Sequence, residues 1–193
     1  MAPTRTELRH LLRARRAALK PGERLAAADA VARHLGGTPL LREPGYVAGY
    51  WAVGGELPLH AVQLRLASGQ VWCLPLVQDD GSLRFAPWRA GDPLAPNRYG
   101  IPEPAVEPAS TLAPSDMSLV LLPLLGFDAA GHRLGMGGGY YDRAFAFRRD
   151  QPAPPRLVGV GYGCQELPAL ATEAWDVALD GIVTEHGYRA IGR

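Results

Sequence analysis

The chain has 193 residues, a formal net charge of +1 and a hydrophobic fraction of 47%. These values are typical of a globular protein and exclude a wholly disordered chain. A dedicated nucleic-acid binder normally has a clear basic excess, which is missing here, and no apolar run reaches the length of about 18 residues that spans a membrane. The length predicts a single domain, residues 1–193, without a nucleic-acid or membrane partner.

The two cysteines, Cys73 and Cys164, are far apart in the sequence. This pattern is typical of a reducing compartment and indicates neither a disulfide framework nor a zinc site. Cys73 lies in an apolar segment, so we expect it to be buried and unreactive. The N-terminal sequence has no apolar core of the signal-peptide type. We therefore expect a cytoplasmic protein, and its composition favours an enzyme.

Two helices are predicted at the N-terminus. The Thr-Arg-Thr-Glu sequence at residues 4–7 is a capping box for the first helix. The second begins at Pro21, extends to residue 34 or 35, and is stopped by two glycines. Together they predict a helical hairpin with a basic face. That face is either a solvated surface or a phosphate contact through Arg5 or Arg9.

Strand and helix patterns alternate in the middle of the chain. Strand-like segments at residues 46–51 and 71–77 flank a helical pattern at 58–66, which indicates a βαβ unit. A turn then leads into an antiparallel strand at 83–88. Residues 91–114 are rich in proline and are expected to lack regular structure, either as a linker or as a long excursion.

The second half predicts a buried central strand at residues 119–125, ending near Pro123, and further strands at 157–162 and 181–184. Helix is expected from Tyr140 to about residue 149. One face of the strand at 157–162 would leave room for a ligand or a helix because it carries Gly159, Gly161 and Gly163. The fold class predicted is α/β, a mostly parallel open sheet flanked by helices, with an N-terminal helical hairpin.

A glycine-rich loop at residues 135–139 lies between the buried strand and the helix that follows. Backbone N–H groups at a helix N-terminus bind anions, and glycine lets phosphate oxygens approach the backbone. The loop is not a P-loop, because no Gly-Lys-Ser/Thr follows it. It is not a dinucleotide fingerprint either, because Tyr140 stands in place of the third glycine. From the glycines alone, a phosphate site and a structural tight turn both remain open.

Four acidic residues are candidates for chemistry. Asp142 falls in the first turn of the helix after the loop, where it either caps the helix or holds Mg²⁺ beside bound phosphates. Mg²⁺ takes one or two carboxylates, so a second is expected at a neighbouring strand end, from Asp176 or Asp180. Glu56 directly follows the first strand, where ligands of open α/β sheets bind. His132 is either a turn residue or an acid–base group.

The segment Arg133–Arg143, with the sequence RLGMGGGYYDR, is preceded by PLLGFD. This long motif resembles the signature of the 5-formyltetrahydrofolate cyclo-ligase (methenyltetrahydrofolate synthetase) family. Weaker similarities follow the same order over most of the chain, at residues 7–9, 55–56, 100–104, 167–168 and 176–185.

The resemblance implies an ATP- and Mg²⁺-dependent ligase that converts 5-formyltetrahydrofolate to 5,10-methenyltetrahydrofolate and releases ADP and phosphate. In that family the formyl oxygen is thought to attack the γ-phosphate, and N10 of the folate then closes the ring. The implied partners are small molecules, a reduced folate and ATP, and the implied enzyme is a monomer.

The resemblance also assigns residues. The catalytic set that it implies is Glu56, Arg133 and Tyr140. The ATP-binding set is Arg5, Arg9, Arg133, Leu134, Gly135, Met136, Gly137, Gly138, Gly139, Tyr140 and Tyr141. The folate-binding set is Trp51, Glu56, Met136, Gly137, Gly138, Gly139 and Tyr140. The two Mg²⁺ ligands are Asp142 and Asp176.

This chain departs from the family pattern in places. Many members have lysine where Arg5 stands, and some have basic residues at the positions of Met136 and Gly138. Two other interpretations stay open. One is a non-catalytic folate- or nucleotide-binding relative. The other is an isomerase or CoA-transferase type of enzyme on a similar sheet, which needs a carboxylate or lysine base beside its loop; Lys20 is the only lysine here.

Overall fold

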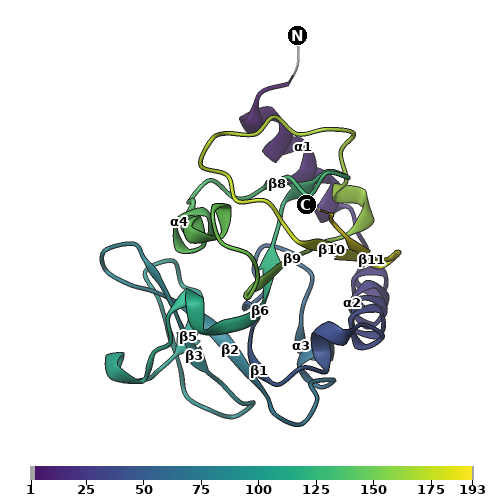
Figure 1. Ribbon diagram of the computed structural model, residues 1–193. Helices are drawn as coiled ribbons and strands as arrows, with labels where there is room; N and C mark the ends of the chain where they lie inside the picture. The colour runs from purple at the N-terminus through teal and green to yellow at the C-terminus, as the bar shows by residue number, and fades with distance from the viewer. Residues whose placement is uncertain (1–2, 193) are drawn as a thin grey trace.

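A mixed seven-stranded sheet runs through the centre of the structure, a computed structural model that describes residues 3–192 (Figure 1). The five inner strands are parallel, and each edge strand runs antiparallel to its neighbour. The predicted mostly parallel open sheet is confirmed. The strand order is β11 (Gly187–Ala190), β10 (Gly181–Thr184), β9 (Arg156–Val160), β6 (Met117–Pro123), β1 (Gly45–Ala48), β2 (Gln70–Val77) and β3 (Leu83–Pro87).

Strand β6 is central because its side chains are apolar on both faces. Residues 119–122 are each at most 3% exposed, and the strand pairs with β1 on one side and with β9 on the other. It ends at Pro123, as predicted, since proline has no N–H with which to extend the ladder. The carboxyl ends of the parallel strands therefore meet at one edge of the sheet.

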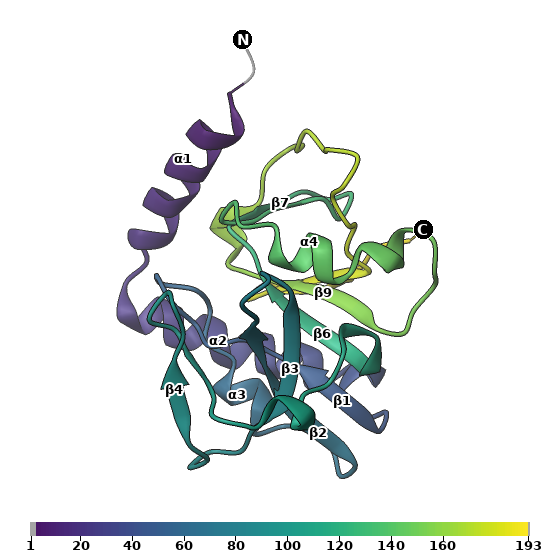
Figure 2. The ribbon, with the colours of Figure 1, turned by 90° about the vertical axis from the view of Figure 1, so that its left-hand side faces the viewer.

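Helices cover both faces of the sheet (Figures 1 and 2). On one face, α2 (Pro21–Gly36) and α3 (His60–Gln63) contact each other and share an apolar cluster with Leu121. On the other face, α4 (Tyr140–Ala144) and the 3₁₀ turn η4 (Ala146–Arg149) frame Phe145, which packs with Val120 and Leu122. The alternation along β6 assigns its successive side chains to the two layers.

Helix α1 (Arg5–Ala17) docks beside the carboxyl ends of the strands. Its predicted capping box is present, with hydrogen bonds in both directions between Thr4 and Glu7. Leu12 is fully buried and packs with Leu125 and Leu134. Leu125 lies just after β6, and Leu134 lies just before the glycine loop. The helix also contacts η5 (Gly163–Gln165), just past β9. This docking leaves the arginines of α1 beside the edge of the sheet where ligands bind.

The proline-rich stretch does form regular structure, contrary to the sequence prediction. Strands β4 (Leu94–Pro96) and β5 (Pro102–Pro104) pair antiparallel. The prolines fall where the ladder needs no N–H group. The N–H of Asn97 donates to the Ile101 carbonyl, and the N–H of Ala105 donates to the Pro93 carbonyl. Short 3₁₀ turns follow at η2 (Pro108–Ser110) and η3 (Pro114–Asp116), and another, η1, covers Pro39–Leu41.

Other local predictions need correction. The first strand ends at Ala48, and the helix expected at 58–66 reduces to α3. A small hairpin of β7 (Gly126–Phe127) and β8 (Arg133–Leu134) separates β6 from the glycine loop, and the helix after it stops at Ala144 before continuing as η4. Strand β11 was missed, because nothing in its sequence separates it from a loop.

The glycines of β9 do not leave room for a ligand. The strand ends at Val160, so Gly161 and Gly163 lie beyond it. An added Cβ on Gly159 would lie 2.5 Å from Leu124 and 2.6 Å from Leu179. These leucine side chains fill the space, so Gly159 makes room for core side chains and not for a ligand.

Of the helices in residues 3–192, none is long and apolar enough to cross a bilayer.

Candidate active site

An apolar pocket opens beside the carboxyl ends of β1 and β6. Its volume is about 640 Å³, counted with its open mouth. Its walls come from the segment after β1, from β2, from the β4–β5 hairpin and from α4, and they include Trp51, Glu56, Val77, Ile101, Glu103 and Tyr140. A concave, mostly apolar site with a few convergent polar groups is typical of small-molecule binding.

Glu56 enters the pocket from a tight turn. The turn needs left-handed backbone at Gly54 (φ +57°) and Gly55 (φ +81°), which glycine adopts without strain. The N–H of Glu56 donates to the Val53 carbonyl at 3.1 Å, and the N–H of Val53 donates to Glu56 Oε2 at 3.1 Å. Burial raises the pKa of the Glu56 carboxyl, which the Val53 N–H and Arg16 partly oppose. The carboxyl is thus fixed as an acceptor in the pocket wall.

Tyr140 joins this pocket to the glycine loop. Its hydroxyl forms a hydrogen bond with the Tyr99 hydroxyl and accepts one from Arg98 Nη2 at 3.2 Å. These two contacts, with Tyr99 the larger influence, lower the pKa of Tyr140. The Arg143 guanidinium lies 5.1 Å from the centre of the Tyr140 ring. The tip of the β4–β5 hairpin therefore reaches across the pocket to α4.

The glycine loop is exposed at residues 136–138, and Gly137 has a φ of +106°. Arg9 of α1 donates from Nε to the Gly135 carbonyl at 3.0 Å, and an added Cβ on Gly137 would lie 3.7 Å from the Arg9 guanidinium. Burial, together with Arg5 and Arg13, lowers the pKa of Arg9. Because α4 has only five residues, the attraction for an anion here comes from loop N–H groups and these arginines more than from a helix dipole.

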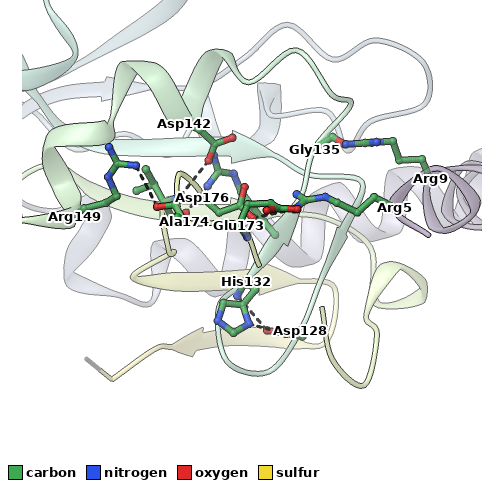
Figure 3. A network of polar contacts seen from close by, with 12 residues as sticks. Arg5, Arg9, Asp128, His132, Gly135, Asp142, Arg149, Glu173, Ala174 and Asp176 are labelled. Carbon is green, nitrogen blue, oxygen red and sulfur yellow. Dashed lines mark hydrogen bonds and ion pairs between the residues drawn. The ribbon is translucent and has the colours of Figure 1, made fainter. Parts of the chain in front are cut away.

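Two carboxylates lie beside the loop (Figure 3). Asp142 Oδ1 accepts from Arg133 Nη2 at 2.6 Å and from the N–H of Val177 at 3.1 Å. Asp176 Oδ2 accepts from Arg5 Nη1 at 3.0 Å and from the N–H of Glu173 at 2.9 Å. The second oxygen of each carboxylate accepts no hydrogen bond from residues 3–192.

This arrangement fits a magnesium ion held partly by its substrate. Mg²⁺ prefers oxygen ligands and is usually bound by one or two carboxylates plus phosphates and water. Asp142 and Asp176 supply that number of carboxylates. Asp142 accepts a hydrogen bond from the N–H of Val177, the residue that follows Asp176. Within residues 3–192 no group of three or more His, Cys, Asp or Glu side chains is placed to hold a metal alone. The residues therefore suit a metal that arrives with phosphates.

Asp180 and His132 instead make contacts within the protein that indicate structural roles. Arg148 donates to both oxygens of Asp180, at 3.0 and 3.1 Å, and the Leu157 N–H donates to it at 2.8 Å. His132 Nδ1 lies 2.9 Å from Asp128 Oδ2 within the β7–β8 turn (Figure 3). Of the two alternatives for the second carboxylate, the structure brings Asp176, not Asp180, beside Asp142.

Three other residues in the predicted ATP-binding set face inward. The Arg133 side chain is 6% exposed and donates to Asp142 and to the Val177 carbonyl. Leu134 is 1% exposed in the cluster around Leu12. Tyr141 stacks on Phe145 and lines the apolar pocket. Leu134 is thus buried away from any ligand, while Arg133 acts on Asp142.

The sequence analysis missed the pocket wall formed by the β4–β5 hairpin. Glu103 Oε1 accepts from the Val77 N–H at 2.9 Å and from Asn97 Nδ2 at 2.7 Å, which ties the hairpin to β2. The sequence at residues 100–104 was the signal for this wall, but it was noted only as a weak similarity.

Cys73 is buried as predicted, and burial raises its pKa to about 12.

Comparison with known proteins decides the family. The model of the 5-formyltetrahydrofolate cyclo-ligase family matches residues 1–185. The chain belongs to the 5-formyltetrahydrofolate cyclo-ligase family. It is therefore an enzyme of the ligase class, and the recognition of this family from the glycine-loop motif is confirmed.

Individual cyclo-ligases are similar over nearly their whole length. The 5-formyltetrahydrofolate cyclo-ligase of Haemophilus influenzae is 32% identical, with 93% of this chain and 94% of that one covered. That of Escherichia coli K12 is also 32% identical, over 90% and 96%. The structure of Aquifex aeolicus 5,10-methenyltetrahydrofolate synthetase superimposes with a TM-score of 0.82 at 29% identity, covering 98% and 94%. The Mycoplasma pneumoniae synthetase shares the fold, with a TM-score of 0.71 at 23% identity over 95% and 99%.

Proposed function

We propose that the chain uses ATP and Mg²⁺ to convert 5-formyltetrahydrofolate to 5,10-methenyltetrahydrofolate, releasing ADP and phosphate. Membership of the cyclo-ligase family supports the ligase activity. The observation that carries the proposal is that an apolar pocket adjoins a glycine- and arginine-rich anion site. Tyr140 belongs to both, since it lines the pocket and ends the glycine loop. A reaction between a folate and a nucleotide needs such a junction.

The apolar pocket would take the pterin ring of the folate. Trp51 and Ile101 offer apolar surface, and Trp51 is braced by Trp88, with ring centres 5.9 Å apart. Glu56, when ionised, would accept hydrogen bonds from ring N–H groups, because a carboxylate is an acceptor only. Residues 136–140 would contact both the folate and the nucleotide.

The glycine loop would cradle the ATP phosphates. Loop N–H groups supply donors, and Arg5 and Arg9 of α1 supply charge, which phosphoryl transfer needs more than covalent help from the protein. Tyr140, at the junction, would lie beside the phosphoryl group in transfer. Arg133 would act by holding Asp142 in place.

The chemistry balances as two displacements. The formyl oxygen forms a bond to the γ-phosphorus, and the bond from that phosphorus to ADP breaks. N10 then bonds to the formyl carbon and loses its proton, and phosphate leaves with the former formyl oxygen and carries that proton away. Phosphorylation is needed because an amide oxygen is a poor leaving group. Asp142 and Asp176 would hold Mg²⁺, which neutralises phosphate charge when bound.

We further propose that residues 1–193 act as one catalytic domain. The central sheet takes strands from Gly45 through to Ala190, so no piece shorter than residues 45–190 contains it. The proposed partners are small molecules alone, a reduced folate and ATP. The protein would act as a monomer in the cytoplasm.

Near-ultraviolet absorbance of the methenyl product tests the function. We expect absorbance to rise only when 5-formyltetrahydrofolate, ATP and Mg²⁺ are all present, with ADP released in equal amount. No rise, with folate or ATP still bound in calorimetry, would favour a non-catalytic relative. No binding of either substrate would overturn the proposal.

A further inference from the structure

The helical hairpin also contacts the turn that carries Glu56. Arg16, in the last turn of α1, is 3% exposed, and its guanidinium makes no hydrogen bond or ion pair within residues 3–192. An added Cβ on Gly54 would lie 3.6 Å from Arg16 Nη2, so the guanidinium lies against the turn of residues 53–56. Burying a charge costs free energy unless another group compensates it.

Arg24 of α2 fixes the same turn from the other side. Its Nη1 donates to the Gly55 carbonyl at 3.4 Å, and its Nη2 donates to the Arg16 carbonyl at 2.8 Å. Its Nε donates to the Leu19 carbonyl at 3.0 Å. An added Cβ on Gly55 would lie 2.5 Å from Arg24 Nη1, so only glycine leaves room for the contact. One guanidinium thus links the end of α1 to the Glu56 turn.

The groups around Arg16 include one carboxylate. Within residues 3–192, the ionisable groups that face it are Glu56, Tyr50, Tyr162 and Arg24. Those that face Glu56 are Arg16 from α1, Tyr50 from the segment after β1, and Tyr141 from α4. The tyrosines are neutral at neutral pH, since burial raises the pKa of each one. Glu56 is therefore the group whose charge Arg16 compensates.

We propose that Arg16 is a positioning residue, which keeps Glu56 ionised for the pterin ring through its charge while Arg24 holds the backbone of the turn. Arg16 is absent from the pocket lining, so it acts from behind Glu56 and not on the substrate. The inference rests on the proposed role of Glu56 in folate binding.

The test is the pH dependence of kcat/KM for the folate in Arg16→Gln. Without the arginine, only the Val53 N–H opposes the effect of burial on Glu56, so its ionised form appears at higher pH. We expect the acid limb of the profile to move up by about one pH unit, with a folate KM about tenfold higher on that limb. The KM for ATP and the kcat at high pH should stay unchanged. Arg16→Lys keeps the charge and should leave the limb near its original position.

Arg15→Gln is the matched control, because Arg15 is exposed, lies on the same helix and, within residues 3–192, hydrogen-bonds from its side chain only to the Cys164 carbonyl at 3.4 Å. Glu56→Gln is measured in parallel and should remove the acid limb. An unmoved limb in Arg16→Gln, with the limb removed in Glu56→Gln, overturns the inference and leaves the proposed function intact. A Glu56→Gln enzyme with unchanged folate KM overturns both the role of Glu56 and the inference.

Folding of Arg16→Gln is checked by thermal unfolding. If this variant does not fold, the double variant Arg16→Gln/Glu56→Gln decides, since it removes both charges. A double variant that folds supports the pairing of the two charges. A double variant that also fails to fold overturns it.

Discussion

Arg133 and Asp142 form a short ion pair, with 2.6 Å between Nη2 and Oδ1, at the base of the glycine loop. The Arg133 side chain is 6% exposed and that of Asp142 is 24% exposed. Asp142 also accepts from the Val177 N–H, so one carboxylate links α4 to the loop that carries Asp176. The pair therefore connects the stability of this region to its proposed role in magnesium binding.

Asp142→Asn should abolish most Mg²⁺-dependent turnover and also lower stability. The amide oxygen still accepts from Val177, but buried Arg133 loses its charge partner, which we expect to cost about 1–3 kcal/mol. Urea unfolding and steady-state turnover measure the two effects. Asp150→Asn is the control, since Asp150 is exposed and close in sequence. Normal turnover in folded Asp142→Asn would rule out the metal role.

Arg9→Met should raise the KM for ATP about tenfold and leave the folate KM unchanged. Arg9 donates from its guanidinium to a backbone carbonyl of the glycine loop, and a charged hydrogen bond contributes about 1.5–3 kcal/mol. Arg13→Met removes an equal charge one helical turn away, where the one hydrogen bond of Arg13 to residues 3–192 is a long contact with the Met136 sulfur at 4.0 Å. Equal effects of the two substitutions would show that net charge, not the loop contact, governs ATP affinity.

Asn97→Ala should raise the folate KM without changing the KM for ATP. Asn97 Oδ1 accepts from the N–H groups of Tyr99 and Ile101, and its Nδ2 donates to Glu103. Loss of these bonds frees the tip of the β4–β5 hairpin, which walls the apolar pocket but does not contact the arginines of α1. Initial rates at varied folate and ATP separate the two constants. A selective change in ATP affinity would assign the hairpin to the other substrate.

Glu56→Gln should remove the loss of stability that Glu56 causes as the pH rises, while weakening folate binding. Burial raises the pKa of Glu56 in the folded state above the usual value of 4.5, so the folded state binds this proton more tightly than the unfolded state does. Stability therefore falls as the pH rises from the unfolded pKa through the folded one. Thermal unfolding from pH 4 to pH 7 should show the variant gaining on the wild type. A constant difference would mean that Glu56 ionises normally.

The strongly local features of the fold were predictable. The capping box at Thr4 and Glu7 and the end of β6 at Pro123 depend on neighbours in sequence, and both are present. The motif around residues 133–143 was enough to recognise the family. The β4–β5 hairpin was not predicted, because its prolines disrupt the residue pattern by which strands are recognised. Only the pairing of the two strands shows which positions need an N–H group.

The sequence by itself determined the α/β class, the parallel sheet, the glycine loop and the candidate carboxylates. These follow from periodicity, turn residues and motif spacing, which act over a few residues. The residue pattern left Asp176 and Asp180 open and the family resemblance named Asp176; tertiary structure placed Asp176 beside Asp142 and brought Arg16 behind Glu56. Such pairings join residues far apart in the chain. They depend on how α1 packs across the strand ends, and no local pattern encodes that contact.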